Sequence, residues 1–256
     1  MTMTGFKILS ICLVFVSGCI GGTLPLRIRM SAHGRRLLDM GNAFAGGIFL
    51  GAGFIHLLGD GLENFSNAAP DMDYPLPLLL CGIAFLSVLA IEKVWLHGHA
   101  EEVVSTNKAF YPFLLLFVLS LHSTIAGLSL GLEQTLSASL ILLVAILAHK
   151  STAAFALGVS LRKANMPKPR FCGLIALFSA MTPLGIGLGA VFAARASGHA
   201  AAWGETVFDS LAAGTFLYIA VVDILDEVFG EPGDRPAKFS LTLGGFVLMA
   251  LLALWT

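Results

Sequence analysis

The residues best suited to chemistry are a few ionisable side chains embedded in long apolar stretches. His56 and Asp60 lie four residues apart, whereas His122 and His149 lie in two later stretches. Burying such groups is costly, which makes them candidates for function. Neutral imidazoles are good ligands for zinc and similar divalent ions. The pattern therefore indicates a divalent metal site, although histidines hydrogen-bonded to buried hydroxyls or carbonyls fit it as well.

Helical geometry predicts how these residues are positioned. His56 and Asp60 share one helical face, so the carboxylate can bind a metal or orient the imidazole. Only residues 133–136 connect the stretch that contains His122 to the one that contains His149. We therefore expect two antiparallel neighbouring helices whose histidines reach similar depths.

The composition restricts the class of protein that can carry these residues. Of the 256 residues, 57% are hydrophobic and 12% are charged, and the mean hydropathy is +0.86. In an ordinary cytosolic enzyme, the share of charged residues is about twice as high. The net charge of −1 gives no basic surface for nucleic acid. The four cysteines form no C-x-x-C pair and predict no disulfide framework.

Eight stretches are long enough, or nearly so, to cross a bilayer as helices of about 20 residues. They are Phe6–Leu26, Met40–Gly59, Leu76–Trp95, Phe110–Leu132, Ser137–Leu161, Phe171–Ala194, Glu205–Leu225 and Phe239–Trp255. Short alternating segments typical of a membrane β-barrel are absent from the sequence. We predict an all-α integral membrane protein with the lipid bilayer as its surroundings. Residues 1–256 form a single domain, with a short cytoplasmic loop at about 96–109.

The positive charges predict the orientation. Lysines and arginines concentrate in the odd-numbered connections, for example at 27–36 and 162–170, whereas Lys7 and Arg195 stand alone on the other face. The positive-inside rule then makes the odd connections cytoplasmic and both termini extracytoplasmic. The sequon at Asn64 falls on the predicted outer face. A signal peptide competes as an interpretation of the first stretch, but its apolar run continues to Leu26.

Several motifs resemble one family. Residues 122–132 read HSTIAGLSLGL, which resembles the H-S-x-x-E-G-x-x-x-G signature of ZIP zinc/iron transporters. The segments GFIHLL at 53–58, FSAMTPLGIGLG at 178–189 and AGTFLYI at 213–219 look similar to the animal plasma-membrane branch of that family. The resemblance spans nearly the whole chain and implies an eight-helix carrier with outward termini.

The resemblance also implies a site between the fourth and fifth helices. His122 and His149 correspond to metal ligands, and Ser123 lines the same site. Lys150 stands where some relatives bind a second metal through a carboxylate. A fixed ammonium there would replace that ion, which favours a single-metal site.

Two alanines depart from the family pattern. Ala126 and Ala153 stand where many relatives carry glutamates, so each helix lacks a hard oxygen ligand. His56, Asp60 or water would have to complete the metal site. We therefore expect weaker metal binding, or a different selectivity, than in relatives that keep the glutamates.

The resemblance implies inward transport of a divalent ion, most simply zinc, with no prosthetic group. It places the chain in the plasma membrane or an organelle membrane, with a second copy of the chain as a candidate partner. Two alternatives remain open at this point. The alanines favour a divergent, non-transporting regulatory protein, and GLSLG at 127–131 fits the G-x-S-x-G pattern of an intramembrane serine protease acting through Ser129.

Overall fold

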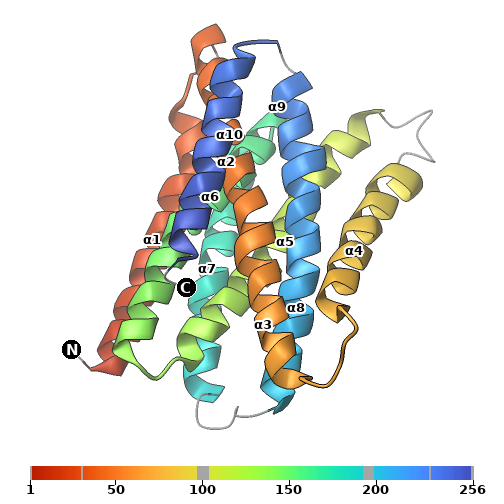
Figure 1. The fold of residues 1–256 in the computed structure, drawn as a ribbon. Helices are drawn as coiled ribbons and strands as arrows, with labels where there is room; N and C mark the ends of the chain where they lie inside the picture. Colours follow the sequence, from red (N-terminus) through yellow and green to blue (C-terminus); the bar gives the residue numbers. More distant parts are fainter. Residues whose placement is uncertain (1, 30, 97–103, 193–198, 231, 255–256) are drawn as a thin grey trace.

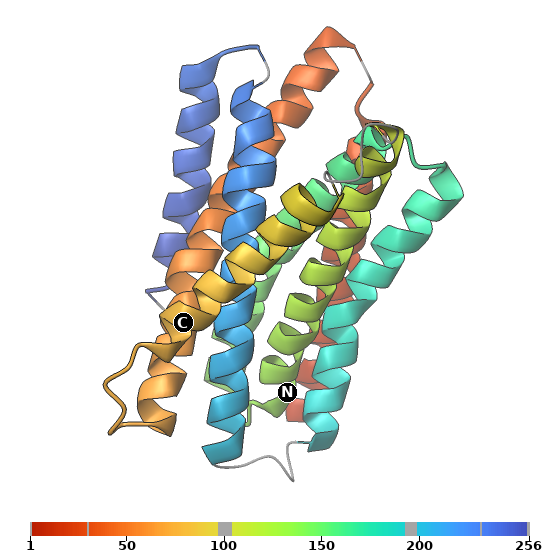
Figure 2. The same cartoon turned by 90° about the vertical axis from the view of Figure 1, so that its right-hand side faces the viewer.

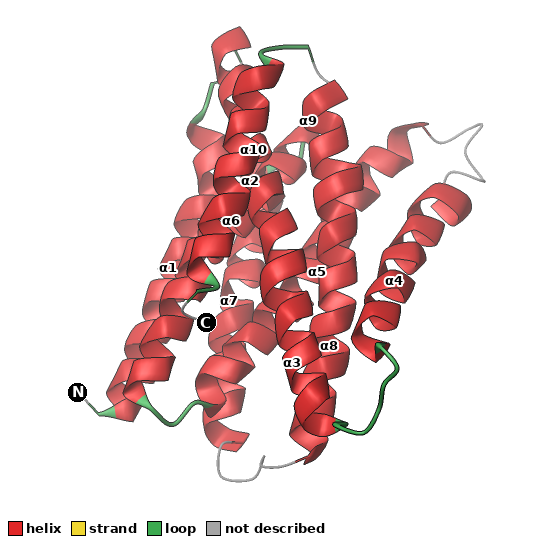
Figure 3. Ribbon diagram, in the orientation of Figure 1, coloured by secondary structure: helices red, strands yellow, loops and turns green. Residues whose placement is uncertain are grey.

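The described part of the chain is helical. The computed structural model describes residues 2–29, 31–96, 104–192, 199–230 and 232–254, and no strand occurs among them (Figure 3). The elements are α1 (Met3–Arg27), α2 (Ala32–Gly51), η1 (Ala52–Leu57), α3 (Leu58–Ala68), α4 (Leu76–Leu89), η2 (Ala90–Leu96), α5 (Val104–Leu132), α6 (Leu136–Lys163), α7 (Lys168–Phe192), α8 (His199–Tyr218), η3 (Ile219–Leu225), α9 (Asp226–Gly230) and α10 (Arg235–Leu252). The three η elements are π-helical turns that continue the α-helices before them.

Eight of the described helices are long and apolar enough to cross a membrane, which confirms the prediction of an eight-helix integral membrane protein. The second span differs most from its predicted limits, because it runs from Ala32 to Ala68. Ser31 caps its start by accepting a hydrogen bond from the Gly34 amide at 3.1 Å. The helix then continues through η1, so Asn64 lies inside α3 rather than in a loop. Residues 97–103 of the expected loop lie outside the described residues, and α5 already begins at Val104.

The helices form two bundles. In one, α5 packs along α7 and α6 packs along α1; in the other, α10 packs on α2, and α8 packs on α3 and α4 (Figures 1 and 2). We refer to them as the α1/α5/α6/α7 bundle and the α2/α4/α8/α10 bundle. They meet through α2 against α6 and through α5 against α8. The chain passes from one bundle to the other three times, so each bundle is assembled from distant parts of the chain.

The two ends of the molecule carry different connections. The lower face in Figure 1 holds the N-terminus and residues 69–75 and 133–135, and the upper face holds residues 28–29, 164–167 and 232–234. Pro183 lies inside α7, which is assigned as one helix from Lys168 to Phe192. The helices α5 and α7 pack closely here. Gly185 lies against the backbone of Thr124, and Gly127 lies against that of Thr182.

Candidate metal site

A π-helical turn positions the first histidine. His56 belongs to η1, at the point where α2 passes into α3. Such turns widen a helix by one residue and often occur at functional sites. Nδ1 of His56 lies 2.9 Å from Oδ2 of Asp60. The pair predicted from the spacing of four residues is therefore in contact.

Three imidazoles from three helices gather where the bundles meet. The ring centroids of His122 on α5 and His149 on α6 lie 5.6 Å apart, and those of His56 and His149 lie 6.2 Å apart. His122 and His149 are each 6% exposed. Nδ1 of His149 is buried and has no hydrogen-bond partner among the described residues. A buried, unpaired nitrogen is costly unless something binds it, which fits a site that accepts a cation.

The three histidines lie close together but are not in coordinating positions. Within the described residues, no group of three or more His, Cys, Asp or Glu side chains is arranged to hold a metal ion. Zinc–nitrogen bonds are about 2.0–2.1 Å long, so the rings would have to rotate or move inward around an ion. His122 and His149 lie on neighbouring helices of one bundle, and His56 lies on the other.

A cavity of about 500 Å³ leads from the lower face to this cluster. His56 and His122 line its floor, and Gln134 lies near its mouth. The described lining residues include five carboxylates and no lysine or arginine: Asp60, Glu63, Glu133, Glu205 and Asp209. A cavity lined by one sign of charge raises the local concentration of the opposite ion. This one favours cations.

Glu133 at the mouth of the cavity is held in its charged form. Its Oε1 accepts hydrogen bonds from the backbone amides of Thr135 at 2.7 Å and Gln134 at 2.8 Å, and from the Thr135 hydroxyl at 3.0 Å. These hydrogen bonds hold the pKa of Glu133 below its ordinary value, and the one from the Thr135 amide has the largest effect. The carboxylate is therefore ionised at neutral pH.

Lys150 faces away from the cavity and is 2% exposed. Its ammonium donates hydrogen bonds to the Ser123 hydroxyl and the Phe178 carbonyl, both at 3.0 Å, and lies 3.6 Å from the centroid of the Phe178 ring. Ser123, which was expected to line the metal site, accepts this hydrogen bond through its hydroxyl oxygen. The ammonium thus links α6 to α5 and α7 by hydrogen bonds, next to His122 and His149 in the sequence.

The two alanines at the family's glutamate positions have different surroundings. Ala126 lines the cavity one turn from His122. Ala153 is 6% exposed and packs in the main hydrophobic core. Ser129 also lines the cavity, but it lies within the continuous α5 helix and donates a hydrogen bond to the Ile125 carbonyl at 3.2 Å. It therefore lacks the sharp turn that exposes the serine of a G-x-S-x-G hydrolase.

Four residues that the structure places around the site were not predicted to belong to it. Glu205 and Asp209 lie four apart on α8 and face the cavity, and Asn64 donates a hydrogen bond to Asp209 at 3.5 Å. Phe216 packs edge-on against His122 with centroids 4.7 Å apart. The spacing of Glu205 and Asp209 was a sequence signal for a shared face. Nothing in the sequence indicated which helix that face would meet.

These features define a multi-pass membrane protein with a carboxylate-lined cavity that ends on histidines between two helical bundles. The family model for ZIP zinc transporters matches residues 4–109 and 97–253. The chain belongs to the ZIP zinc transporter family. Members of this family are transporters and not enzymes, which excludes the serine protease alternative for this chain.

Individual relatives extend the similarity over most of the chain. It is 31% identical to zinc transporter ZIP2 of Mus musculus, with 95% of each chain covered. It is 31% identical to zinc transporter ZIP1 of Homo sapiens over 86% of this chain and 79% of the relative. It is 32% identical to zinc transporter ZIP1 of Danio rerio, with 85% of each covered.

Proposed function

We propose that this protein carries zinc across the membrane through a site formed by His122 and His149. One observation carries the proposal: the two imidazoles lie 5.6 Å apart, centroid to centroid, on neighbouring helices beside a cavity lined by carboxylates. The relatives named zinc transporters supply the choice of ion. In this proposal His56, assisted by Asp60, completes the ligand set from the opposite bundle.

The path begins in the cavity. Its carboxylates attract a hydrated cation and replace part of the water around it. Deeper in the site, neutral imidazole nitrogens bind a borderline ion such as zinc better than a hard ion such as magnesium. Because the ligands belong to both bundles, a relative movement of the bundles changes the coordination and releases the ion. Such alternating access is expected of a carrier with a site between two helical units.

Lys150 makes a second, adjacent metal unnecessary. A fixed ammonium at this depth supplies the positive charge that an ion would otherwise bring, and it holds Ser123 and Phe178 by hydrogen bonds. We therefore propose a single-ion site in which Ser123 acts through Lys150.

The cavity opens to the face that carries the N-terminus. The positive-inside rule assigns that face to the outside, so we propose uptake toward the cytoplasm, with the plasma membrane as the expected location. A homodimer is compatible with this arrangement, but nothing in the mechanism requires one.

Purified protein in liposomes tests the proposal against the regulatory alternative. We expect saturable uptake of zinc, with cadmium as a competitor and with iron(II) and manganese transported less well. A regulatory partner would show no uptake of any of these ions at either neutral or acidic pH, and that result would end the proposal.

Restoring the carboxylate at Ala126 should strengthen metal binding. Ala126→Glu places an acidic oxygen in the cavity one turn from His122, where it can join the ligands. We expect the zinc affinity measured by calorimetry to rise by about tenfold, which corresponds to roughly 1.4 kcal/mol. Ala126→Gln has nearly the same shape without the charge and serves as the control. Equal affinities in both variants and the parent would argue against a metal at this position.

Removing a charge from the cavity should weaken capture rather than translocation. Asp209→Asn keeps the shape of the side chain, so we expect the KM for zinc to rise by about two- to fivefold with little change in kcat. The effect should shrink as ionic strength rises, because the charge acts through solvent. Asp71→Asn, in the exposed connection after α3, is the matched control. A change confined to kcat would assign Asp209 to a later step.

A further inference from the structure

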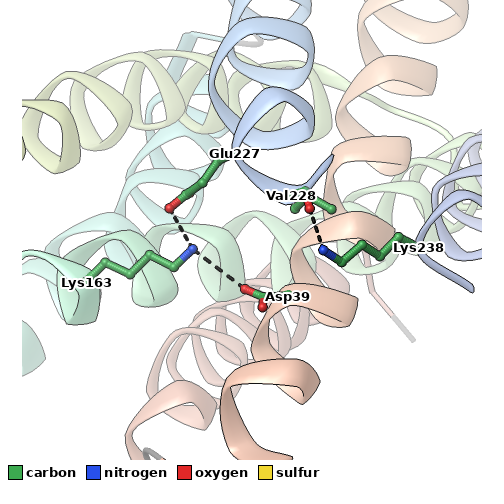
Figure 4. Close-up of polar contacts among 5 residues, drawn as sticks. All are labelled: Asp39, Lys163, Glu227, Val228 and Lys238. Atoms are coloured by element: carbon green, nitrogen blue, oxygen red, sulfur yellow. Dashed lines mark hydrogen bonds and ion pairs between the residues drawn. The ribbon is translucent and has the colours of Figure 1, made fainter. Parts of the chain in front are cut away.

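An ion-pair cluster on the upper face joins the two bundles. Lys163, at the end of α6, donates a hydrogen bond to Oε1 of Glu227 at 2.8 Å, and its Nζ lies 3.9 Å from Oδ1 of Asp39 (Figure 4). Lys163 belongs to the α1/α5/α6/α7 bundle, whereas Asp39 on α2 and Glu227 on α9 belong to the other. The cluster therefore spans the boundary between the bundles at the end opposite the cavity mouth.

The two carboxylates are fixed within their own bundle. Next to Glu227, the Val228 carbonyl accepts a hydrogen bond at 2.6 Å from Lys238, which is 4% exposed (Figure 4). On the same bundle, the hydroxyl of Thr242 on α10 donates to the Ala43 carbonyl on α2 at 3.1 Å. These bonds hold α2, α9 and α10 together. A separation of α2 and α9 from α6 therefore lengthens the distance from Lys163 to both carboxylates.

The interior below this cluster is closed. Ala45 and Phe49 of α2 and Ala156, Leu157 and Leu161 of α6 belong to one hydrophobic core, and each of the five is at most 4% exposed. The cavity, in contrast, is lined by residues from the histidines to the lower face. The structure is thus open toward the lower face and sealed toward the upper face.

We propose that Lys163, with Asp39 and Glu227, is a latch that favours this state. The inference rests on the proposed function to the extent that the histidine site must at some stage open to the upper face. Opening requires α2 to separate from α6, and that separation pulls the ammonium away from both carboxylates. The side chains of Lys163, Asp39 and Glu227 are 33%, 21% and 45% exposed, so water replaces the lost contacts in part. The latch therefore biases the equilibrium between the two states and does not lock it.

Cysteine labelling measures this bias without requiring transport. Ser160 lies one turn before Lys163 on α6, is 9% exposed, and its hydroxyl has no partner among the described residues. We would introduce Ser160→Cys into protein whose native Cys12, Cys19, Cys81 and Cys172 are replaced by alanine. The purified protein, in detergent and free of metal, is then treated with a small charged thiol reagent.

We expect Lys163→Ala to raise the labelling rate of Cys at position 160 by about two- to tenfold, the effect of losing one or two partly exposed ion pairs. Lys163→Glu should raise it further, because it places like charges together, and Lys163→Glu combined with Glu227→Lys should bring the rate back toward that of the parent. Lys168→Ala removes a cation from the same face that makes no ion pair with the described residues, and it should leave the rate unchanged.

A labelling rate that is the same in Lys163→Ala as in the parent would overturn the latch. So would a charge-swapped pair that labels as fast as Lys163→Glu alone. Zinc uptake by the same proteins separates this inference from the proposed function. Labelling that responds in a protein without uptake leaves the latch standing and removes the transport proposal. Zinc uptake in a protein whose labelling rate does not respond to Lys163→Ala leaves the transport proposal standing and removes the latch.

Discussion

Replacing either His122 or His149 with alanine is expected to reduce zinc uptake in proteoliposomes to background. Each substitution removes one of two imidazoles whose ring centroids lie 5.6 Å apart beside the inner end of the cavity. The remaining carboxylates line the cavity between the histidines and its mouth, and as hard oxygen ligands they do not replace a buried nitrogen. Initial rates of uptake measured with a zinc-sensitive dye inside the liposomes provide the readout.

Two comparisons make this result specific. His33→Ala removes an exposed histidine near the start of α2 and should transport zinc at the parent rate. Each variant should also remain folded in detergent, because removing one buried side chain costs less than the total free energy of unfolding. Thermal unfolding in detergent checks this. Normal uptake in both His122→Ala and His149→Ala would show that the ion takes another path.

Gly185→Ala is expected to lower the melting temperature by several degrees and to reduce the amount of folded protein. A Cβ at this position would overlap the Thr124 carbonyl and the Leu128 amide nitrogen on α5. Both are backbone atoms, so the clash can be relieved only by moving one helix. Overpacking of this kind costs about 1–3 kcal/mol, and an upper value is expected here. Thermal unfolding of the purified protein, followed by tryptophan fluorescence, measures the loss.

Gly187 provides the matched control two residues further along α7. A Cβ there meets no other atom within 4 Å. Since alanine favours a helix over glycine by about 1 kcal/mol, Gly187→Ala should be neutral or slightly stabilising. If the two alanine variants unfold at the same temperature, the close contact between α5 and α7 is not what stabilises this bundle.

The number and nature of the helices could be predicted because hydropathy depends on the local sequence alone. The spans required by the bilayer appeared as apolar stretches, and all eight are present. Their limits were less predictable. The second span extends beyond its apolar part to Ala68, since polar residues such as Asn64 and Asp60 face a cavity within the protein. Hydropathy cannot distinguish a polar residue in a loop from one that faces a cavity.

Part of the candidate site was also readable from spacing. The spacing of four positions from His56 to Asp60 implied a shared helical face, and a short connection implied that His122 and His149 would lie at similar depths. The approach of Asp209 and Phe216 depends instead on how α8 packs against α3 and α5, which the sequence of one helix does not encode. The π-helical turn at Ala52–Leu57, which contains His56, was likewise not predicted from the sequence.

The location of a bound zinc ion tests the account most directly. Crystals or lipid-phase crystals of the protein grown with zinc can be measured at the zinc absorption edge, where only zinc contributes strong anomalous scattering. We predict one peak between the rings of His122 and His149, at bonding distance from a nitrogen of each, with His56 close by. A zinc peak elsewhere in the helices, with both rings unligated, would contradict the proposal.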